Sequence, residues 1–232
     1  MMPDPVSEEV KIPTNGEPGK KRSGLGTIDL SPLRTSREFR LLFIGQGVSF
    51  FGSMMTFVVL PWQMYQLTKS SLAVGLLGVA EFVPILLMAF VGGALADAVD
   101  RRRMVRLTEL LLAAGSGVLV INSLLPNPQV WVLFVCAAAF ATLNGLQRPS
   151  LEALAPRLLP PEQIPAAIAL NSLGRTVGGV AGPALGGFLA ATAGTAFTYS
   201  IDLITFAISL VALWMMSAVR RLRAQTVPAS AR

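Results

Sequence analysis

The sequence contains no histidine, a single cysteine and few charged residues. Without histidine, and with one thiol, the chain cannot assemble a disulfide framework or the common zinc ligand sets, so we expect no metal site. The cysteine, Cys136, lies in an apolar run and is interpreted as a small packing residue. A phosphate-binding loop ending in Lys-Ser/Thr and a nucleophile motif are also missing, which makes an enzyme or an ATP-driven pump the weakest candidates.

Charged residues make up 14% of the chain and hydrophobic residues 53%. Soluble domains carry about 25% charged residues, so this composition indicates a protein that lies in the lipid bilayer. The polar segment 1–38 lacks the apolar core of a signal peptide and is predicted to be a disordered cytoplasmic tail. Its basic run at 20–22 is expected to face water or lipid headgroups, and no nucleic acid is expected as a partner despite the net charge of +6.

Six stretches are apolar over the length of about 20 residues that a helix needs to cross the hydrocarbon core. They lie near residues 41–65, 73–97, 104–125, from 130 into the 150s, from about 165 to 191, and near 196–218. Backbone groups in lipid must be hydrogen-bonded within their own segment, which favours helices over strands. The sequence therefore predicts an all-α integral membrane fold, a six-transmembrane-helix bundle over 39–218, followed by a basic cytoplasmic tail at 219–232.

The basic residues are distributed unevenly between the two sides of this bundle. They gather in the N-terminal tail, between the second and third spans, near the end of the fourth span, and after the sixth span, whereas the other three loops hold only Lys69. Because lysine and arginine are retained on the cytoplasmic side, both termini are predicted to be cytoplasmic.

A charged motif ends the second predicted span. The stretch GGALADAVDRRRM, from Gly92 to Met104, turns from apolar residues to two aspartates and three arginines. A cytoplasmic collar of positive charge explains the arginines, but it does not explain an aspartate placed before them. The motif residues are Gly93, Leu95, Ala96, Asp97, Asp100, Arg101, Arg102 and Arg103.

A glycine-rich motif, LGRTVGGVAGPALGG at 173–187, occupies the fifth predicted span. Small residues at four-residue spacing let helix backbones approach closely, and Pro183 can bend the helix. Ordinary helix packing would explain the glycines alone. The residues of interest are Gly174, Gly178, Gly179, Gly182, Pro183, Gly186 and Gly187.

Together the two motifs resemble those of the major facilitator superfamily, in its drug and siderophore exporter branch. The first is similar to the signature G-x-L-A-D-[RK]-x-G-R-[RK], from which Ala98 and Asp100 depart, and the second matches G-x3-G-P-x2-G-G, which is associated with exporters and antiporters. The resemblance covers about residues 33–218. It implies one six-helix half of the fold, a cytoplasmic gate latch at the first motif, and proton-driven efflux of a small organic molecule across a bacterial inner membrane, with no cofactor besides the proton gradient.

Ionisable residues inside the predicted spans are costly and usually functional or paired. Glu81 and Asp202 are expected at similar depth in the outer half. Each could couple transport to protons, because a poorly hydrated carboxyl can exchange protons near neutral pH, or could be a structural acid near the headgroups. Arg175 could attract an anionic substrate, pair with an acid or extend to the cytoplasm. Glu109 is expected to be structural, near the arginines of the loop.

A polar face runs along the first predicted span, where Gln46, Ser49, Ser53 and Thr56 recur at helical spacing. We expect this face to turn to the bundle interior, either as a cavity lining or as hydrogen bonds between helices. Gln46 is the member that we add to the candidate proton or substrate site.

Six helices are half the number typical of the superfamily, whose substrates bind between two halves. Three interpretations follow: a truncated gene or one half of a split gene, a six-helix protein that dimerises to rebuild a cavity, or a membrane subunit without transport activity. The expected partners are a small-molecule substrate, the lipid bilayer, and a C-terminal six-helix half or a second copy.

Overall fold

The computed structural model describes residues 29–98 and 100–225, and every regular element in these ranges is helical. The α-helices are α1 (Ser31–Thr35), α2 (Arg37–Thr68), α3 (Ser71–Ala98), α4 (Arg101–Leu124), α5 (Val130–Leu154), α6 (Ile164–Thr192) and α7 (Thr195–Gln225). Two short 3-10 helices, η1 (Ala155–Leu158) and η2 (Pro161–Gln163), join α5 to α6. For residues 89, 91–98, 155–156 and 217–225 the description is limited to the backbone.

The long helices α2 to α7 coincide with the six predicted apolar stretches, which confirms the all-α fold. Five of them, α2, α3, α4, α5 and α7, are long and apolar enough to cross a membrane. Helix α6 has 29 residues, but its glycines and Arg175 lower its hydropathy, and it is not among the five. That all six helices cross the bilayer therefore stays a prediction.

The predicted disordered tail at 1–38 is wrong for its last residues. Helix α1 lies within it, and the hydroxyl of Ser36 caps α2 by accepting a hydrogen bond of 3.2 Å from the backbone N–H of Phe39. Phe39 is buried against Leu159 and Ala167, so apolar burial holds this segment to the bundle. Residues 1–28 and 226–232 lie outside the described residues, and the backbone of α7 is helical to Gln225.

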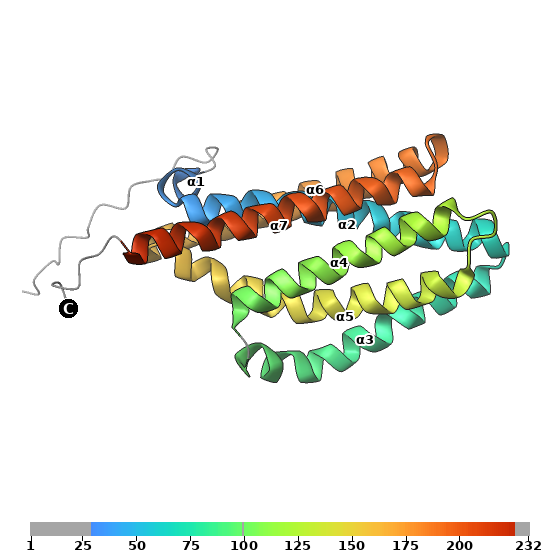
Figure 1. Ribbon diagram of the computed structural model, residues 1–232, viewed down its shortest axis with the longest axis horizontal. Coiled ribbons are helices and arrows are strands. Elements are labelled where there is room, and N and C mark those ends of the chain that lie inside the picture. Colours follow the sequence, from blue (N-terminus) through green and yellow to red (C-terminus); the bar gives the residue numbers. More distant parts are fainter. Residues whose placement is uncertain (1–28, 99, 226–232) are drawn as a thin grey trace, which may run out of the picture.

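The long helices pack side by side in the order α6–α2–α7–α4–α5–α3. Figure 1 shows α2, α6 and α7 as one group and α3, α4 and α5 as another, and α7 contacts α4 where the groups meet. Helices α2 and α3, although consecutive, share little contact. The arginine-rich start of α4 and the start of α2 lie at the same end of the bundle, as the charge pattern predicts, and the cytoplasmic placement of that end stays a prediction.

The largest apolar core among the described residues contains buried side chains of all six long helices, around Met64, Leu133 and Tyr199. Cys136 is buried in this core, as expected for a packing residue. The outer surface is also apolar: large exposed side chains include Phe57, Phe82, Phe90, Trp131, Val180, Phe188 and Trp214. Such a surface suits contact with lipid or with other helices and does not suit water.

The glycines of α6 form two rows with different surroundings. A Cβ added to Gly186 would lie 2.7 Å from Met55 Cα and 2.8 Å from its carbonyl oxygen, and one added to Gly182 would lie 3.0 Å from the Phe51 carbonyl oxygen. By contrast, a Cβ on Gly179 or Gly187 would meet no atom within 4 Å. The row containing Gly178, Gly182 and Gly186 therefore allows α6 to pack backbone to backbone against α2.

We predict that Gly186→Ala destabilises the bundle by about 1–3 kcal/mol, because the new methyl group meets backbone atoms that cannot move aside. Gly187→Ala is the matched control, since it brings the same gain in helix propensity into open space. Thermal unfolding of both variants in detergent measures the difference. Equal melting temperatures would show that α6 and α2 are not in close contact.

Candidate functional site

One face of α4 carries four polar residues at seven-residue spacing: Arg102, Glu109, Ser116 and Ser123. Seven residues make nearly two turns of an α-helix, so these residues lie in one line along α4. Each of them bonds to a polar side chain of α2 or α7. We call these four residues and their partners the polar row.

Glu109 is fully buried in the polar row, between α2 and α7. Its Oε1 accepts hydrogen bonds from Gln46 Nε2 at 2.6 Å and from Ser209 Oγ at 2.7 Å. Its Oε2 accepts one from Ser49 Oγ at 3.2 Å. Both carboxyl oxygens therefore have donors, and all three donors are neutral. The expected position beside the arginines of the loop is wrong, because the side chain points to α2 and α7.

Asp202 on α7 is also buried in the polar row, with 1% of its surface exposed. Its Oδ2 accepts hydrogen bonds from Thr56 Oγ1 at 2.7 Å and from Ser116 Oγ at 2.8 Å. Its Oδ1 is buried and receives no hydrogen bond within the described part of the chain. A Cβ on Gly52 would collide with Thr205 Oγ1 and lie 2.7 Å from Oδ1, so both oxygens face α2 at Gly52. The hydroxyl of Thr205 donates a hydrogen bond of 2.7 Å to the backbone carbonyl of Asp202.

These contacts confirm that the polar face of the first span turns to the bundle interior. Gln46, Ser49 and Thr56 all bond across to α4 or α7, and of the two alternatives stated for this face the structure shows hydrogen bonds between helices. Two of the predicted site residues, Gln46 and Asp202, also bond to the same face of α4, Gln46 to Glu109 and Asp202 to Ser116.

Further contacts extend the polar row towards both ends of the bundle. At one end Tyr199 donates a hydrogen bond of 2.9 Å to Gln63 Oε1, and Gln63 Nε2 donates one of 2.9 Å to Ser123 Oγ. At the other end Arg102 forms an ion pair of 3.2 Å with Glu38, and both side chains are partly exposed.

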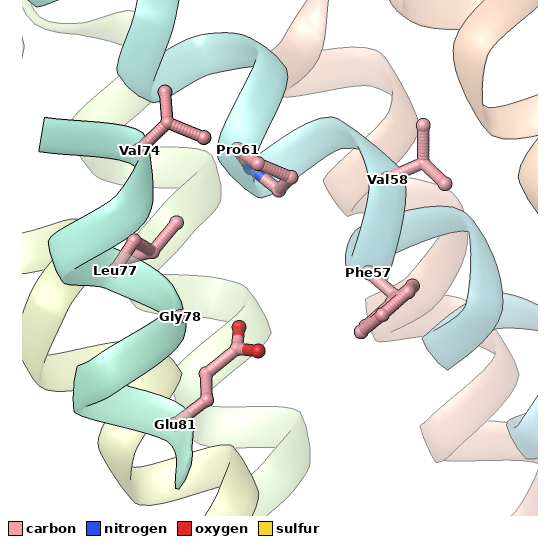
Figure 2. A pocket seen from close by; sticks show the side chains of 7 residues that line it. All are labelled: Phe57, Val58, Pro61, Val74, Leu77, Gly78 and Glu81. Carbon is pink, nitrogen blue, oxygen red and sulfur yellow. The ribbon is translucent and has the colours of Figure 1, made fainter. Parts of the chain in front are cut away.

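Glu81 lies apart from the polar row, on α3. It is half-buried at an open recess of about 280 Å³ between α2 and α3, shown in Figure 2. The other lining residues are apolar: Phe57, Val58, Pro61, Val74, Leu77 and Gly78. The two predicted carboxyls therefore occupy different surroundings, Glu81 beside an open apolar recess and Asp202 in a closed polar interface.

The predicted basic candidate, Arg175, is exposed on α6 and lines neither the recess nor the polar row. Arg148 and Glu152, one helical turn apart on α5, form an ion pair with 3.2 Å between Arg148 Nε and Glu152 Oε1. Both of these side chains are mostly exposed, so their contribution to stability is small.

The charged motif at 93–103 is described in part. Gly93, Leu95 and Asp97 belong to the last turns of α3, and their side chains lie outside the described residues. Asp100 caps α4: its Oδ1 accepts hydrogen bonds from the backbone N–H groups of Arg102 at 2.9 Å and of Arg103 at 3.4 Å. The departure of Asp100 from the motif therefore has a local role as a helix cap. Arg101 is half-buried and Arg103 is exposed.

Sequence reasoning missed the role of Glu109 and the serines on α4. The signal that could have found them is the seven-residue spacing of Glu109, Ser116 and Ser123 in an otherwise apolar span. Three polar residues on one helical face predict a polar neighbour on that side.

We predict that Asp100→Ala lowers the stability of the bundle by about 1 kcal/mol through loss of the α4 cap, whereas Asp100→Asn keeps most of it. The backbone hydrogen bond from Arg102 is the main cause that lowers the pKa of Asp100 below its ordinary value. The carboxylate's contribution is therefore full above about pH 4 and is lost as the pH falls through the lowered pKa. Denaturation of both variants at neutral pH tests this, and equal loss in both would contradict a capping role.

Comparison with known proteins places these features in a family. The family model described as a transmembrane secretion effector matches residues 27–230. Over 178 residues, which are 75% of this chain and 42% of each relative, the chain is 32% identical to the enterobactin exporter of Citrobacter koseri and 31% identical to that of Salmonella choleraesuis. The enterobactin exporter of Escherichia coli O139:H28 is also 31% identical over the same share. The chain thus spans less than half the length of these curated relatives. It is a multi-pass membrane protein and belongs to the transmembrane secretion effector family of major facilitator transporters.

Proposed function

We propose that this chain forms one six-helix half of an exporter that moves a small organic molecule out of a bacterial cell across the inner membrane. The family match over residues 27–230 carries this proposal. The similarity to enterobactin exporters makes enterobactin the first substrate to test. Transport proceeds by alternating access, and the inward flow of protons drives it.

The recess between α2 and α3 is proposed as part of the substrate path. Its apolar lining, with Phe57 at one side, suits the apolar surface of an organic molecule, and Glu81 offers one carboxyl for a hydrogen bond or a positive charge. Proton exchange at Glu81 would change the charge that the substrate meets.

A second six-helix half completes the path in this proposal, supplied by a separate chain, a continuation of the gene or a second copy. Two observations support it: the chain spans 42% of its curated relatives, and large apolar side chains of α3 and α6 are exposed, among them Phe82, Phe90, Val180 and Phe188. Substrates of major facilitator transporters bind between two such halves.

The transport proposal is tested in proteoliposomes that contain this chain together with a second half, with enterobactin as substrate and an imposed pH gradient. Accumulation should follow the gradient and should fall at least about tenfold in Glu81→Gln, which cannot exchange a proton. Glu152→Gln, an exposed carboxyl on α5, is the matched control and should leave transport unchanged. Transport that is independent of the pH gradient, or unchanged in Glu81→Gln, would contradict coupling at Glu81.

The gate motif gives a separate prediction. If Asp97 helps to latch the cytoplasmic side, Asp97→Asn should slow transport while the protein inserts and unfolds like the wild type. Substrate flux in the same vesicles, together with thermal unfolding in detergent, makes the comparison. Wild-type flux in Asp97→Asn would show that the motif identifies the family without acting as a latch here.

A further inference from the structure

We propose that the polar row holds a proton on Asp202, bound to Oδ1, and that Glu109 is the ionised member of the pair. Only the role of this proton in transport rests on the proposed function. The presence of the proton is a property of the six-helix chain itself and can be tested without any substrate.

The first argument concerns charge. The donors to Glu109 are an amide and two hydroxyls, and the donors to Asp202 are two hydroxyls. Neutral donors stabilise a buried carboxylate only in part, and a second ionised carboxylate in the same interface adds repulsion. Asp202 bonds to Ser116, which lies seven residues from Glu109, so the two carboxyls are about 10 Å apart. Protonation of one carboxyl removes one buried charge and the repulsion.

The second argument decides which carboxyl holds the proton. Glu109 has three hydrogen bonds distributed over both oxygens, the arrangement that suits a carboxylate anion. Asp202 receives both of its hydrogen bonds on Oδ2, while Oδ1 is buried without a donor among the described residues. A carboxylic acid has this asymmetry: its carbonyl oxygen accepts hydrogen bonds, and its hydroxyl donates one. Thr205 Oγ1, which also faces Gly52, can serve as the acceptor for the hydroxyl at Oδ1. The geometry therefore favours Glu109 as the anion and Asp202 as the acid.

The remaining ionisable groups are placed so that Glu109 is the charged group nearest to Asp202 in the polar row. Tyr199 lies about one turn from Asp202 on α7, and its hydroxyl donates a hydrogen bond to Gln63 Oε1. Helix α2 has no charged residue between Arg40 and Lys69. The other groups on these helices, or directly after them, are Arg37, Glu38, Arg40 and Tyr65 on α2, Lys69 after α2, Glu81 and Asp97 on α3, Arg101, Arg102, Arg103 and Arg106 on α4, Cys136, Arg148 and Glu152 on α5, Arg175 on α6, and Arg220, Arg221 and Arg223 on α7.

Release of the proton has a defined structural consequence. It leaves a charged, undonated Oδ1 facing the backbone of α2 at Gly52, in the interface between α2 and α7. The charge can be relieved by rotation of the neighbouring Thr205 hydroxyl or by entry of water, and entry of water requires α2 and α7 to separate there. Protonation therefore favours a closed α2–α7 contact and deprotonation an open one, which is the type of two-state element that proton-coupled transport needs.

The test is infrared difference spectroscopy of the purified chain in lipid nanodiscs at neutral pH. We expect a carbonyl stretching band from a protonated carboxyl that shifts in deuterium oxide, disappears in Asp202→Asn and persists in Glu109→Gln. Ser116→Ala removes one hydrogen bond to Oδ2 and should raise the frequency of this band. Ser123→Ala is the matched control, because Ser123 lies on the same face of α4 and bonds to Gln63 instead.

Two results would overturn the proposal. One is a wild-type spectrum in which Asp202 contributes only carboxylate bands, which would mean that Oδ1 is ionised and has another donor. The other is a band that is lost in Glu109→Gln and kept in Asp202→Asn, which would place the proton on Glu109. Should Asp202→Asn fail to fold, the band shift in Ser116→Ala against Ser123→Ala decides. Because no transport is measured, failure of the proposed function leaves this result unaffected.

Discussion

Polar groups within an apolar bundle must find their partners inside the protein, and this constraint organises the contact of α4 with α2 and α7. A polar line along α4 would be costly in lipid, so it must face two helices that carry matching hydroxyls and amides. Gln46 and Ser209 meet Glu109, and Thr56 and Ser116 meet Asp202. Apolar packing between these helices is non-directional, whereas these hydrogen bonds fix their register.

The bundle separates two kinds of carboxyl environment. Glu81 lies beside an open recess with an apolar lining, where a bound molecule could reach it. Asp202 and Glu109 are closed off by three helices and can respond only to protons or to movement of those helices. Such a division suits an exporter, since the path of an organic molecule and the path of a proton need different widths and different linings.

Helix positions could be predicted closely from the sequence, because the turns PNPQ and TAGT lie between α4 and α5 and between α6 and α7. The polar face of the first span was also predictable from its spacing. The partners were not, since Gln46 and Glu109 are 63 positions apart and local periodicity carries no information on which faces meet. Glu109 was assigned to the arginines because Arg106 is close in sequence. The helix at Ser31–Thr35 was missed because its packing depends on distant residues, since Leu33 packs against a core that contains Leu159.

Close packing at Gly186 also determines how the bundle can move. The contact at Gly186 is with backbone atoms of Met55, whereas Gly178 faces the side chain of Phe50. At Gly186 a shift of α2 relative to α6 would therefore bring backbone atoms into collision. Helix α2 shares little contact with α3, so no comparable link ties these two neighbours. The glycine row thus packs α6 against one side of α2, while Gly52 faces α7 on another side, so α2 contacts both helices at close range.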